Sequence, residues 1–233
     1  MPETTTMPPS QSKLPPLTLI VAATPQNGIG KNGALPWPML KKEMAYFARV
    51  TKRIVAPSNS SSTAEATPRK QNAVLMGRKT WDSIPPRFRP LKDRINLVVS
   101  SQPRDKLEGA TGEVVVASSI LAALGELRES VKEGKCPEVG RVFVIGGARV
   151  YEGALGLDGD VRVGSVLLTR LGREFECDTF FPDLETLGKE EGGKGWVRRG
   201  RRELEEFVGE EVAEGGLVED GVGFEFQLWE RGE

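Results

Sequence analysis

One acidic residue, Glu43, is predicted to face an apolar environment. A helix is predicted over residues 39–53, and its apolar side chains recur at the i, i+4 and i+7 spacing of one helix face, at Leu40, Met44 and Phe47. At about 100° per residue, Glu43 lies within this face. Burying an unpaired carboxylate costs on the order of several kcal/mol. Glu43 is therefore either an edge residue whose carboxyl reaches water, or an acid of raised pKa that binds a cationic heterocycle or relays a proton.

The chain contains no histidine, which narrows the chemistry that it can perform. A Ser-His-Asp triad, a histidine-ligated zinc ion and a histidine general base are all excluded. The two cysteines, Cys136 and Cys177, are too few for a disulfide framework or a four-cysteine metal site, and no local motif activates either thiol. We expect no metal site, so catalysis would depend on carboxylates, hydroxyls, cations, the backbone or a bound cofactor.

Two glycine turns combine with cations at the ends of predicted strands. Residues 76–80 (MGRKT) place a glycine, two cations and a hydroxyl at a strand-to-helix turn, and residues 146–149 (GGAR) repeat that arrangement. Either turn by itself could be an ordinary connection. Helix N-termini and cations bind phosphate, and ligands of open α/β sheets bind at the carboxyl ends of strands. Together the turns predict a dinucleotide ligand that carries extra charge.

A third glycine segment, residues 28–33 (GIGKNG), matches the G-x-G-x-x-G pattern after a strand. In a Rossmann fold this loop opens a helix, but here residues 36–38 (PWP) follow, and residues 51–53 (TKR) supply no acid for a ribose. We therefore reject a Rossmann fold. The segment is either an ordinary surface loop or a flexible loop whose backbone can approach a ligand closely. Arg94, at the start of a predicted strand, is either a surface residue or a bidentate partner for a carboxylate.

The predicted elements alternate between strands and helices. Strands are predicted at residues 17–23, 73–76, 94–100, 114–117, 141–145 and 163–169, and helices at residues 39–53, 78–83 and 119–133, with a short helix after Gly147. This alternation predicts an α/β fold with a mostly parallel sheet. Residues 196–199, 203–208 and 223–230 alternate between apolar and polar, which predicts antiparallel edge strands.

Charge and composition set the broad class of the protein. The net charge is −1, which argues against a general nucleic-acid binder. Residues 183–233 hold 7 Lys and Arg against 15 Asp and Glu, a net of −8, so residues 1–182 carry +7. A positive body suits a polyanionic small ligand, although the asymmetry could equally be surface patterning. No apolar run approaches the roughly 20 residues of a membrane span.

Three segments are expected to lie outside the folded core. Residues 1–16 form a Pro-rich arm that we expect to be disordered; it has neither the apolar region of a secretory signal nor the arginines of a transit peptide, so a cytoplasmic location is expected. Residues 56–71 are polar and of low complexity, and residues 187–223 are dense in Gly and Glu. We expect both as surface insertions in a single domain over residues 17–233.

Seven stretches of the sequence resemble the dihydrofolate reductase family. They are LIVAATPQNGIGKNGALPWP (19–38), LKKEMAYF (40–47), MGRKTWDSIP (76–85), RPLKDRINLVVSSQ (89–102), VIGGARVYE (144–152), LLTRL (167–171) and FECDTFFP (175–182). The resemblance implies one three-layer α/β domain with an eight-stranded sheet. It also implies NADPH-dependent reduction of 7,8-dihydrofolate to 5,6,7,8-tetrahydrofolate, in support of one-carbon metabolism, by a monomer that antifolate inhibitors bind.

The resemblance also implies roles for individual residues. Glu43 matches the acid of the pteridine pocket, Thr169 the hydroxyl bonded to it, and Trp37 the indole that holds an ordered water nearby. Leu35 matches the residue of a mobile loop that packs over nicotinamide and pteridine, and Arg94 the clamp on the α-carboxylate of the glutamate tail. The apolar walls around the folate would be formed by Ile20, Val21, Met44, Phe47, Ile84 and Leu91.

The cofactor residues follow from the same resemblance. Ala22, Ile29 and Gly30 would line the nicotinamide side, which Ile145 and Tyr151 would close from the far strand. The adenosine-phosphate and pyrophosphate positions would be formed by Gly77, Arg78, Lys79, Thr80, Ser100, Ser101, Gly146, Gly147, Ala148, Arg149 and Val150.

Two positions depart from the family pattern. Met44 stands where many relatives carry an aromatic residue, which should soften substrate and inhibitor packing. Ser101 stands where many eukaryotic relatives carry arginine, so Arg78 and Lys79 would have to provide most of the preference for NADP over NAD. Two alternatives are a same-fold reductase of a riboflavin-pathway pyrimidine and a non-catalytic nucleotide-binding module. Trp37, Glu43 and Arg94 together disfavour the first, and the intact acid, tail clamp and loop disfavour the second.

Overall fold

A central β-sheet organises the residues that the computed structural model describes, which are residues 14–55, 70–189 and 195–232. Its strands are β1 (Leu17–Ala23), β3 (Lys70–Gly77), β4 (Ile95–Val99), β5 (Val115–Ala117), β6 (Glu138–Val144), β7 (Val163–Leu171), β9 (Trp196–Arg198), β10 (Leu217–Glu219) and β11 (Val222–Arg231). Eight of them follow the order β10-β11-β7-β1-β6-β3-β4-β5, and β9 also pairs with β11.

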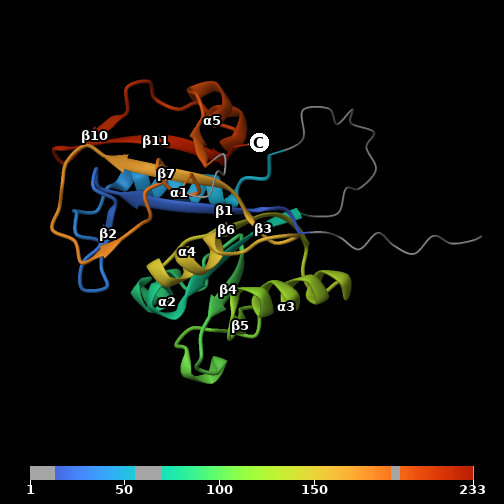
Figure 1. The fold of residues 1–233 in the computed structure, drawn as a ribbon. Helices are drawn as coiled ribbons and strands as arrows, with labels where there is room; N and C mark the ends of the chain where they lie inside the picture. Colours follow the sequence, from blue (N-terminus) through green and yellow to red (C-terminus); the bar gives the residue numbers. More distant parts are fainter. Residues whose placement is uncertain (1–13, 56–69, 190–194, 233) are drawn as a thin grey trace, which may run out of the picture.

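The direction of the strands agrees with the sequence prediction. Neighbours from β7 to β5 are parallel, whereas β11 is antiparallel to β7, β9 and β10. The α/β fold with a mostly parallel sheet and an antiparallel C-terminal edge is therefore confirmed (Figure 1). β1 lies near the middle and is buried almost throughout, as expected for a continuous apolar run covered on both faces.

Helices cover both faces of the sheet and complete three layers (Figure 1). On one face, α1 (Lys41–Lys52), α2 (Arg78–Ser83) and α5 (Arg201–Val208) contribute buried side chains to one apolar cluster. On the other face, α3 (Ile120–Lys132) and α4 (Ala148–Leu155) contribute to a second cluster. Short 3-10 turns, η1 (Pro86–Phe88) and η2 (Arg104–Lys106), follow α2 and β4.

One predicted edge strand is wrong, because residues 203–208 belong to α5. Leu204 and Val208 are buried at the i, i+4 spacing of a helix, and Phe207 packs against the same cluster. Ion pairs of Arg201 with Glu205 and of Arg202 with Glu206 at the same spacing support the helix. The alternation of charged and apolar residues that suggested a strand is the surface pattern of an amphipathic helix.

The segments predicted to lie outside the core have different outcomes. Most of the N-terminal arm (residues 1–13) and of the first insertion (residues 56–69) lie outside the described residues. The second insertion, apart from residues 190–194, supplies β9, α5 and β10, so much of it is part of the folded structure. The predicted loop 24–36 contains the short strand β2 (Gly28–Gly30), which pairs with β8 (Thr179–Phe180).

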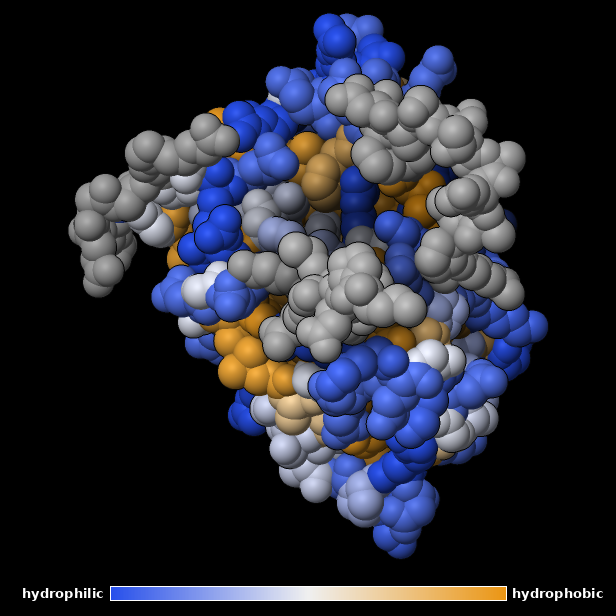
Figure 2. Space-filling view, turned by 90° about the vertical axis from the view of Figure 1, so that its right-hand side faces the viewer, coloured by the Kyte–Doolittle hydropathy of each residue, from blue (hydrophilic) through white to orange (hydrophobic). Residues whose placement is uncertain are grey.

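Hydrophilic residues make up most of the coloured surface in Figure 2, and the hydrophobic residues visible there lie in separate patches. None of the described helices has the length and apolar character that crossing a membrane requires.

One buried amide, that of Asn72, attaches the end of α1 to the sheet. The side chain is fully buried, and Nδ2 donates to the carbonyl oxygens of Thr51 (3.1 Å) and Arg53 (2.9 Å). Its Oδ1 accepts from the backbone N–H of Arg141 at 2.9 Å. All three bonds replace water that these groups would otherwise bind, so the amide acts as a cross-link between α1 and β6.

We expect Asn72→Ala to lower the free energy of unfolding by roughly 2–4 kcal/mol, because it leaves buried backbone groups without partners. Urea denaturation measures the difference. Gln71→Ala, at the neighbouring half-buried position, serves as the control and should stay within about 1 kcal/mol of the wild type. If both variants lost the same free energy of unfolding, the hydrogen bonds of Asn72 would not contribute to stability beyond an ordinary side chain.

Candidate active site

The buried face of α1 is centred on Glu43. The buried residues of the helix are Glu43, Tyr46, Val50 and Thr51, and they form one stripe against the sheet. Met44, which the sequence placed on the apolar face, is 46% exposed and lies at the edge of that stripe. The predicted position of Met44 was therefore wrong, because the true stripe is rotated toward Tyr46.

The carboxyl of Glu43 has one hydroxyl partner in the sheet. Thr169 donates to Glu43 Oε1 at 3.2 Å from β7, and both residues are buried. Burial raises the pKa of Glu43 from 4.5 to about 7, and the hydrogen bond from Thr169 opposes this rise. An acid with this pKa exchanges a proton near neutral pH, which is the property expected of a group that relays protons.

Trp37 lies in the loop before α1, six residues before this acid in the sequence. Trp37 is buried with Leu40 in a small cluster, and its ring meets Phe175 edge-on at 6.0 Å. Ala22 of β1 packs against the same cluster. Leu35, by contrast, is 54% exposed, as a residue that covers a ligand from a loop would be.

The structure brings together most of the predicted apolar wall. The residues that belong to or pack against the cluster on the α1 face of the sheet are Ile20, Phe47, Ile84, Leu91 and Ile145. Val21 does not, because successive side chains of a strand point to opposite faces. Val21 lies in the cluster of the other face, against which Ile29 also packs. Its contact with folate stays a prediction.

Arg94 is buried and held by neighbouring oxygen atoms. Its Nη1 donates to Thr51 Oγ1 at 2.9 Å, and its Nε donates to the carbonyl of Lys92 at 3.0 Å. Burial lowers the pKa of Arg94 to about 10, which still leaves it charged at neutral pH. It forms no ion pair within the described part of the chain. A buried cation without an acidic partner can bind the carboxylate of a ligand.

Thr51 is a site residue that the sequence reasoning missed. Its hydroxyl donates to the carbonyl of Phe47 at 2.7 Å and accepts from Arg94, so it orients the guanidinium. The one signal in the sequence was a polar residue eight positions after Glu43, which is about 80° away around the helix and still within a buried stripe of ordinary width.

Three glycines, Gly77, Gly146 and Gly147, form a glycine cradle at the carboxyl ends of β3 and β6. Gly77 N–H donates to the carbonyl of Gly146 at 2.7 Å, so the two predicted turns are in contact. A Cβ at Gly77 would approach Val150 Cγ2 to 3.0 Å, and one at Gly146 would approach the Tyr151 hydroxyl to 3.2 Å. Glycine is thus favoured at Gly77 and Gly146 because α4 packs closely against the ends of β3 and β6 there.

Tyr151 connects this cradle to the central strand. Its hydroxyl donates to the carbonyl of Ile20 at 2.7 Å, and its ring meets Phe181 edge-on at 5.3 Å. Burial raises the pKa of Tyr151 above its usual range, so it stays neutral. Because its hydroxyl is already bonded, Tyr151 shapes the site mainly through its ring.

The predicted phosphate-binding side chains divide into two groups. Lys79 and Arg149 are exposed beside the glycine cradle, and Ala148 begins α4 directly after it. Thr80 Oγ1 lies 3.4 Å from the Cβ position of Gly147, and Gly30 belongs to β2. Arg78 is already paired with Asp82 at 2.8 Å.

Ser100 and Ser101 differ in their availability to a ligand. Ser101 is exposed, whereas the Ser100 hydroxyl donates to the carbonyl of Gln102 (3.0 Å) and accepts from its N–H (2.9 Å). Ser100 thus closes a turn through both of these bonds, and its contact with phosphate stays a prediction.

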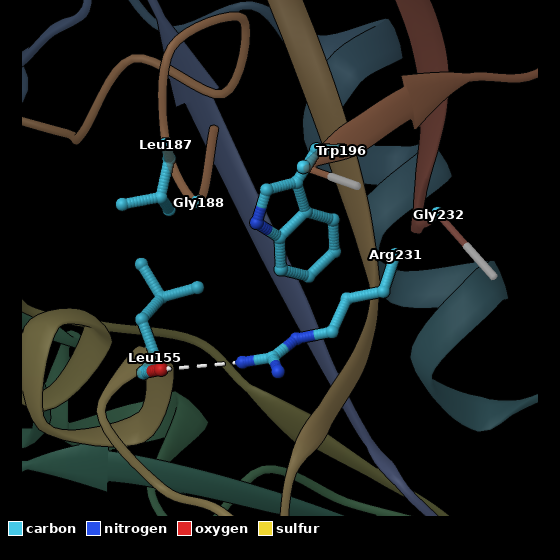
Figure 3. Close-up of a pocket in the computed structure, with 7 residues that line it drawn as sticks. Leu155, Leu187, Gly188, Trp196, Arg231 and Gly232 are labelled. Atoms are coloured by element: carbon cyan, nitrogen blue, oxygen red, sulfur yellow. Dashed lines mark hydrogen bonds between the residues drawn. The ribbon is translucent and has the colours of Figure 1, made fainter. Parts of the chain in front are cut away.

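A cavity of about 270 Å³ lies elsewhere in the molecule (Figure 3). Trp196 and Arg231 line it, and Arg231 donates to the carbonyl of Leu155 at 3.5 Å. Arg231 pairs with Trp196 at the end of β11 that lies beside the start of β7. The cavity is therefore at the amino ends of the parallel strands, opposite to Glu43 and the glycine cradle.

Comparison with known proteins identifies the family of the chain. A family model described as dihydrofolate reductase matches residues 66–191. A dihydrofolate reductase of Cryptococcus neoformans is 38% identical, with 94% of this chain and 96% of the relative covered. The chain belongs to the dihydrofolate reductase family. The Mus musculus dihydrofolate reductase is 39% identical, and the match covers 93% of this chain and 97% of the relative. The solved structure of Schistosoma mansoni dihydrofolate reductase is 33% identical in sequence and matches with a TM-score of 0.66. This match covers 93% of this chain and 98% of the Schistosoma chain.

Membership of this family implies an oxidoreductase with a nicotinamide cofactor. The residues present fit such a group, since the glycine cradle lies directly before the first turns of α2 and α4 and Lys79 and Arg149 are exposed beside it. They would hold the phosphates of a dinucleotide.

The raised pKa of Glu43 predicts how stability depends on pH. The folded pKa of about 7 exceeds the unfolded value near 4.5, so the contribution of this group is fully present below pH 4.5 and is lost as the pH rises through 7. Glu43→Gln, which does not titrate, should gain stability relative to the wild type over this interval, by up to about 3 kcal/mol. Denaturation at pH 5 and pH 8 measures the gain. If the stabilities of Glu43→Gln and the wild type differed by the same amount at pH 5 and pH 8, the raised pKa of Glu43 would be contradicted.

Proposed function

We propose that the protein reduces 7,8-dihydrofolate to 5,6,7,8-tetrahydrofolate with NADPH. The observation that carries the proposal is the buried Glu43 carboxyl, bonded to Thr169 within a largely apolar site at the carboxyl ends of the strands. The relatives are named for this activity. In one-carbon metabolism the product would support thymidylate and purine synthesis.

The protein would orient the reactants and control a proton. Bound NADPH would supply a hydride for the imine carbon of the substrate, whose adjacent ring nitrogen must gain a proton. Glu43 binds the pteridine and, with a pKa near 7, lets water deliver that proton to the ring nitrogen. Trp37 holds water beside the acid, and Leu35 on the loop limits access of bulk solvent. Ile20, Phe47, Ile84, Leu91 and Ile145 enclose the substrate.

The two ends of the site would recognise the charged parts of the ligands. Arg94, oriented by Thr51, binds the α-carboxylate of the folate tail. Lys79 and Arg149, with Arg78 if it leaves Asp82, bind the phosphates and favour NADP over NAD. Antifolate inhibitors would occupy the same apolar wall, with weaker packing at Met44 than an aromatic residue provides.

We propose that the protein is a monomer that acts in the cytoplasm and needs neither nucleic acid nor a membrane. A pyrimidine reductase of the same fold is disfavoured, because its substrate has no glutamate tail for Arg94 and no basic pteridine for Glu43.

The proposal is tested with Glu43→Gln, by following NADPH absorbance with dihydrofolate. We expect turnover to fall at least tenfold at neutral and higher pH, with partial recovery in acid where the substrate is already protonated. Glu126→Gln, an exposed residue of α3, is the control and should match the wild type. Methotrexate should abolish the wild-type rate. A wild-type profile in Glu43→Gln would refute the role of the acid.

Arg94→Leu tests the clamp on the folate tail. We expect KM for dihydrofolate to rise at least tenfold while KM for NADPH changes less than about twofold, because a charge-assisted pair to one ligand alone is lost. Arg104→Leu, an exposed arginine, is the control. An equal rise in both KM values would show that Arg94 supports the fold and not the tail.

A further inference from the structure

The N-terminus of α1 is capped from a distant part of the chain. Helices begin with N–H groups that have no partner within the helix, and a polar residue just before the helix usually caps them. Here that position is Leu40, whose side chain cannot accept a hydrogen bond. Instead Glu219 Oε2 accepts from the N–H of Lys42 at 2.8 Å, 177 positions away in sequence. The bond ends one residue before Glu43.

The strand pair that carries Glu219 also packs against α1. β10 and β11 form an antiparallel pair in which Glu219 faces Val222. Val222 and Phe224 are buried with Trp37 and Leu40 in one cluster. The start of α1 is therefore covered by the strand pair that supplies its cap.

A second contact joins α1 to β11 one turn further along. Tyr46 stacks on Phe226, with ring centroids 3.7 Å apart. Phe226 is the cross-strand neighbour of Thr169, the partner of Glu43. The same strand thus contacts α1 on both sides of Glu43, so a movement of β10 and β11 would change the depth of the carboxyl.

We propose that Glu219 is a positioning residue that fixes the start of α1 and thereby holds the Glu43 carboxyl against Thr169. This inference rests on the proposed function, in which Glu43 acts on the substrate. Glu219 itself is not required to touch a ligand.

The groups that face Glu43 determine whether its pKa rises or falls when Glu219 is removed. They are the Thr169 hydroxyl of β7 and the neutral phenols of Tyr46 in α1 and Tyr151 in α4, both of which interact electrostatically with the acid. None of these is a cation. Without Glu219, the start of α1 would open to water and the positive end of the helix dipole would be uncompensated. Both changes favour the carboxylate, so the pKa of Glu43 should fall.

The test compares Glu219→Ala, Glu219→Gln and Ser119→Ala. Ser119 caps α3, on the opposite face, by accepting from the N–H of Ala122 at 3.1 Å, so its loss removes a helix cap remote from the acid. The ¹³C signal of the Glu43 carboxyl, assigned by its absence in Glu43→Gln, gives the pKa directly. The pH profile of dihydrofolate reduction is recorded in parallel.

We expect the pKa of Glu43 to fall by roughly 0.5–1 unit in Glu219→Ala, which corresponds to the usual strength of a helix cap, and the pH profile to move with it. Glu219→Gln keeps the acceptor and should shift less than half as far. Ser119→Ala should not shift the pKa. If Glu219→Ala does not fold, Glu219→Asp, whose shorter side chain keeps the charge but withdraws the oxygen, takes its place.

Three results would overturn the proposal. They are an unchanged pKa in Glu219→Ala, an equal shift in Ser119→Ala, or an equal shift in Glu219→Gln. Failure of the proposed function would be a separate result. In that case Glu43 of the wild-type protein would still titrate near its raised pKa, but the protein would not reduce dihydrofolate.

Discussion

The burial of one carboxyl group, that of Glu43, is the constraint on which the rest of the site depends. An acid in apolar surroundings keeps a pKa near 7 only while its helix is held close to the sheet and water stays out. The Thr169 hydroxyl opposes the shift without cancelling it, since it donates one hydrogen bond and carries no charge. A small outward movement of α1 would hydrate the carboxyl and return it toward the behaviour of an ordinary surface acid.

The structure accordingly secures α1 along its whole length. Glu219 caps its first turn, Tyr46 stacks on β11 in the middle, and Asn72 binds the carbonyls at its end. Thr51, in the last turn, orients Arg94. In the proposed reaction one helix would thus position both the acid beneath the pteridine and the cation at the folate tail. The distance between these two groups is then set by helix geometry, which hardly varies.

The glycine cradle is coupled to this arrangement through the central strand. Tyr151 follows the cradle in α4 and donates to the carbonyl of Ile20, whose side chain lies in the cluster beneath α1. The proposed cofactor and substrate regions are therefore both connected to the same segment of β1, at the carboxyl ends of the parallel strands. Ile20 and Val21, as successive residues of β1, point to opposite faces of the sheet, so Val21 packs in the other layer.

Local patterns in the sequence determined the strands of the parallel sheet, the two glycine turns and the presence of Glu43 within the buried face of its helix, because periodicity and turn chemistry act over a few residues. The sequence did not determine which residues meet across the sheet. The cap from Glu219, the bond from Arg94 to Thr51, the exposure of Met44 and the burial of the helix at residues 201–208 follow from packing between distant segments. Local propensity is weak compared with such contacts, so only the tertiary structure decided them.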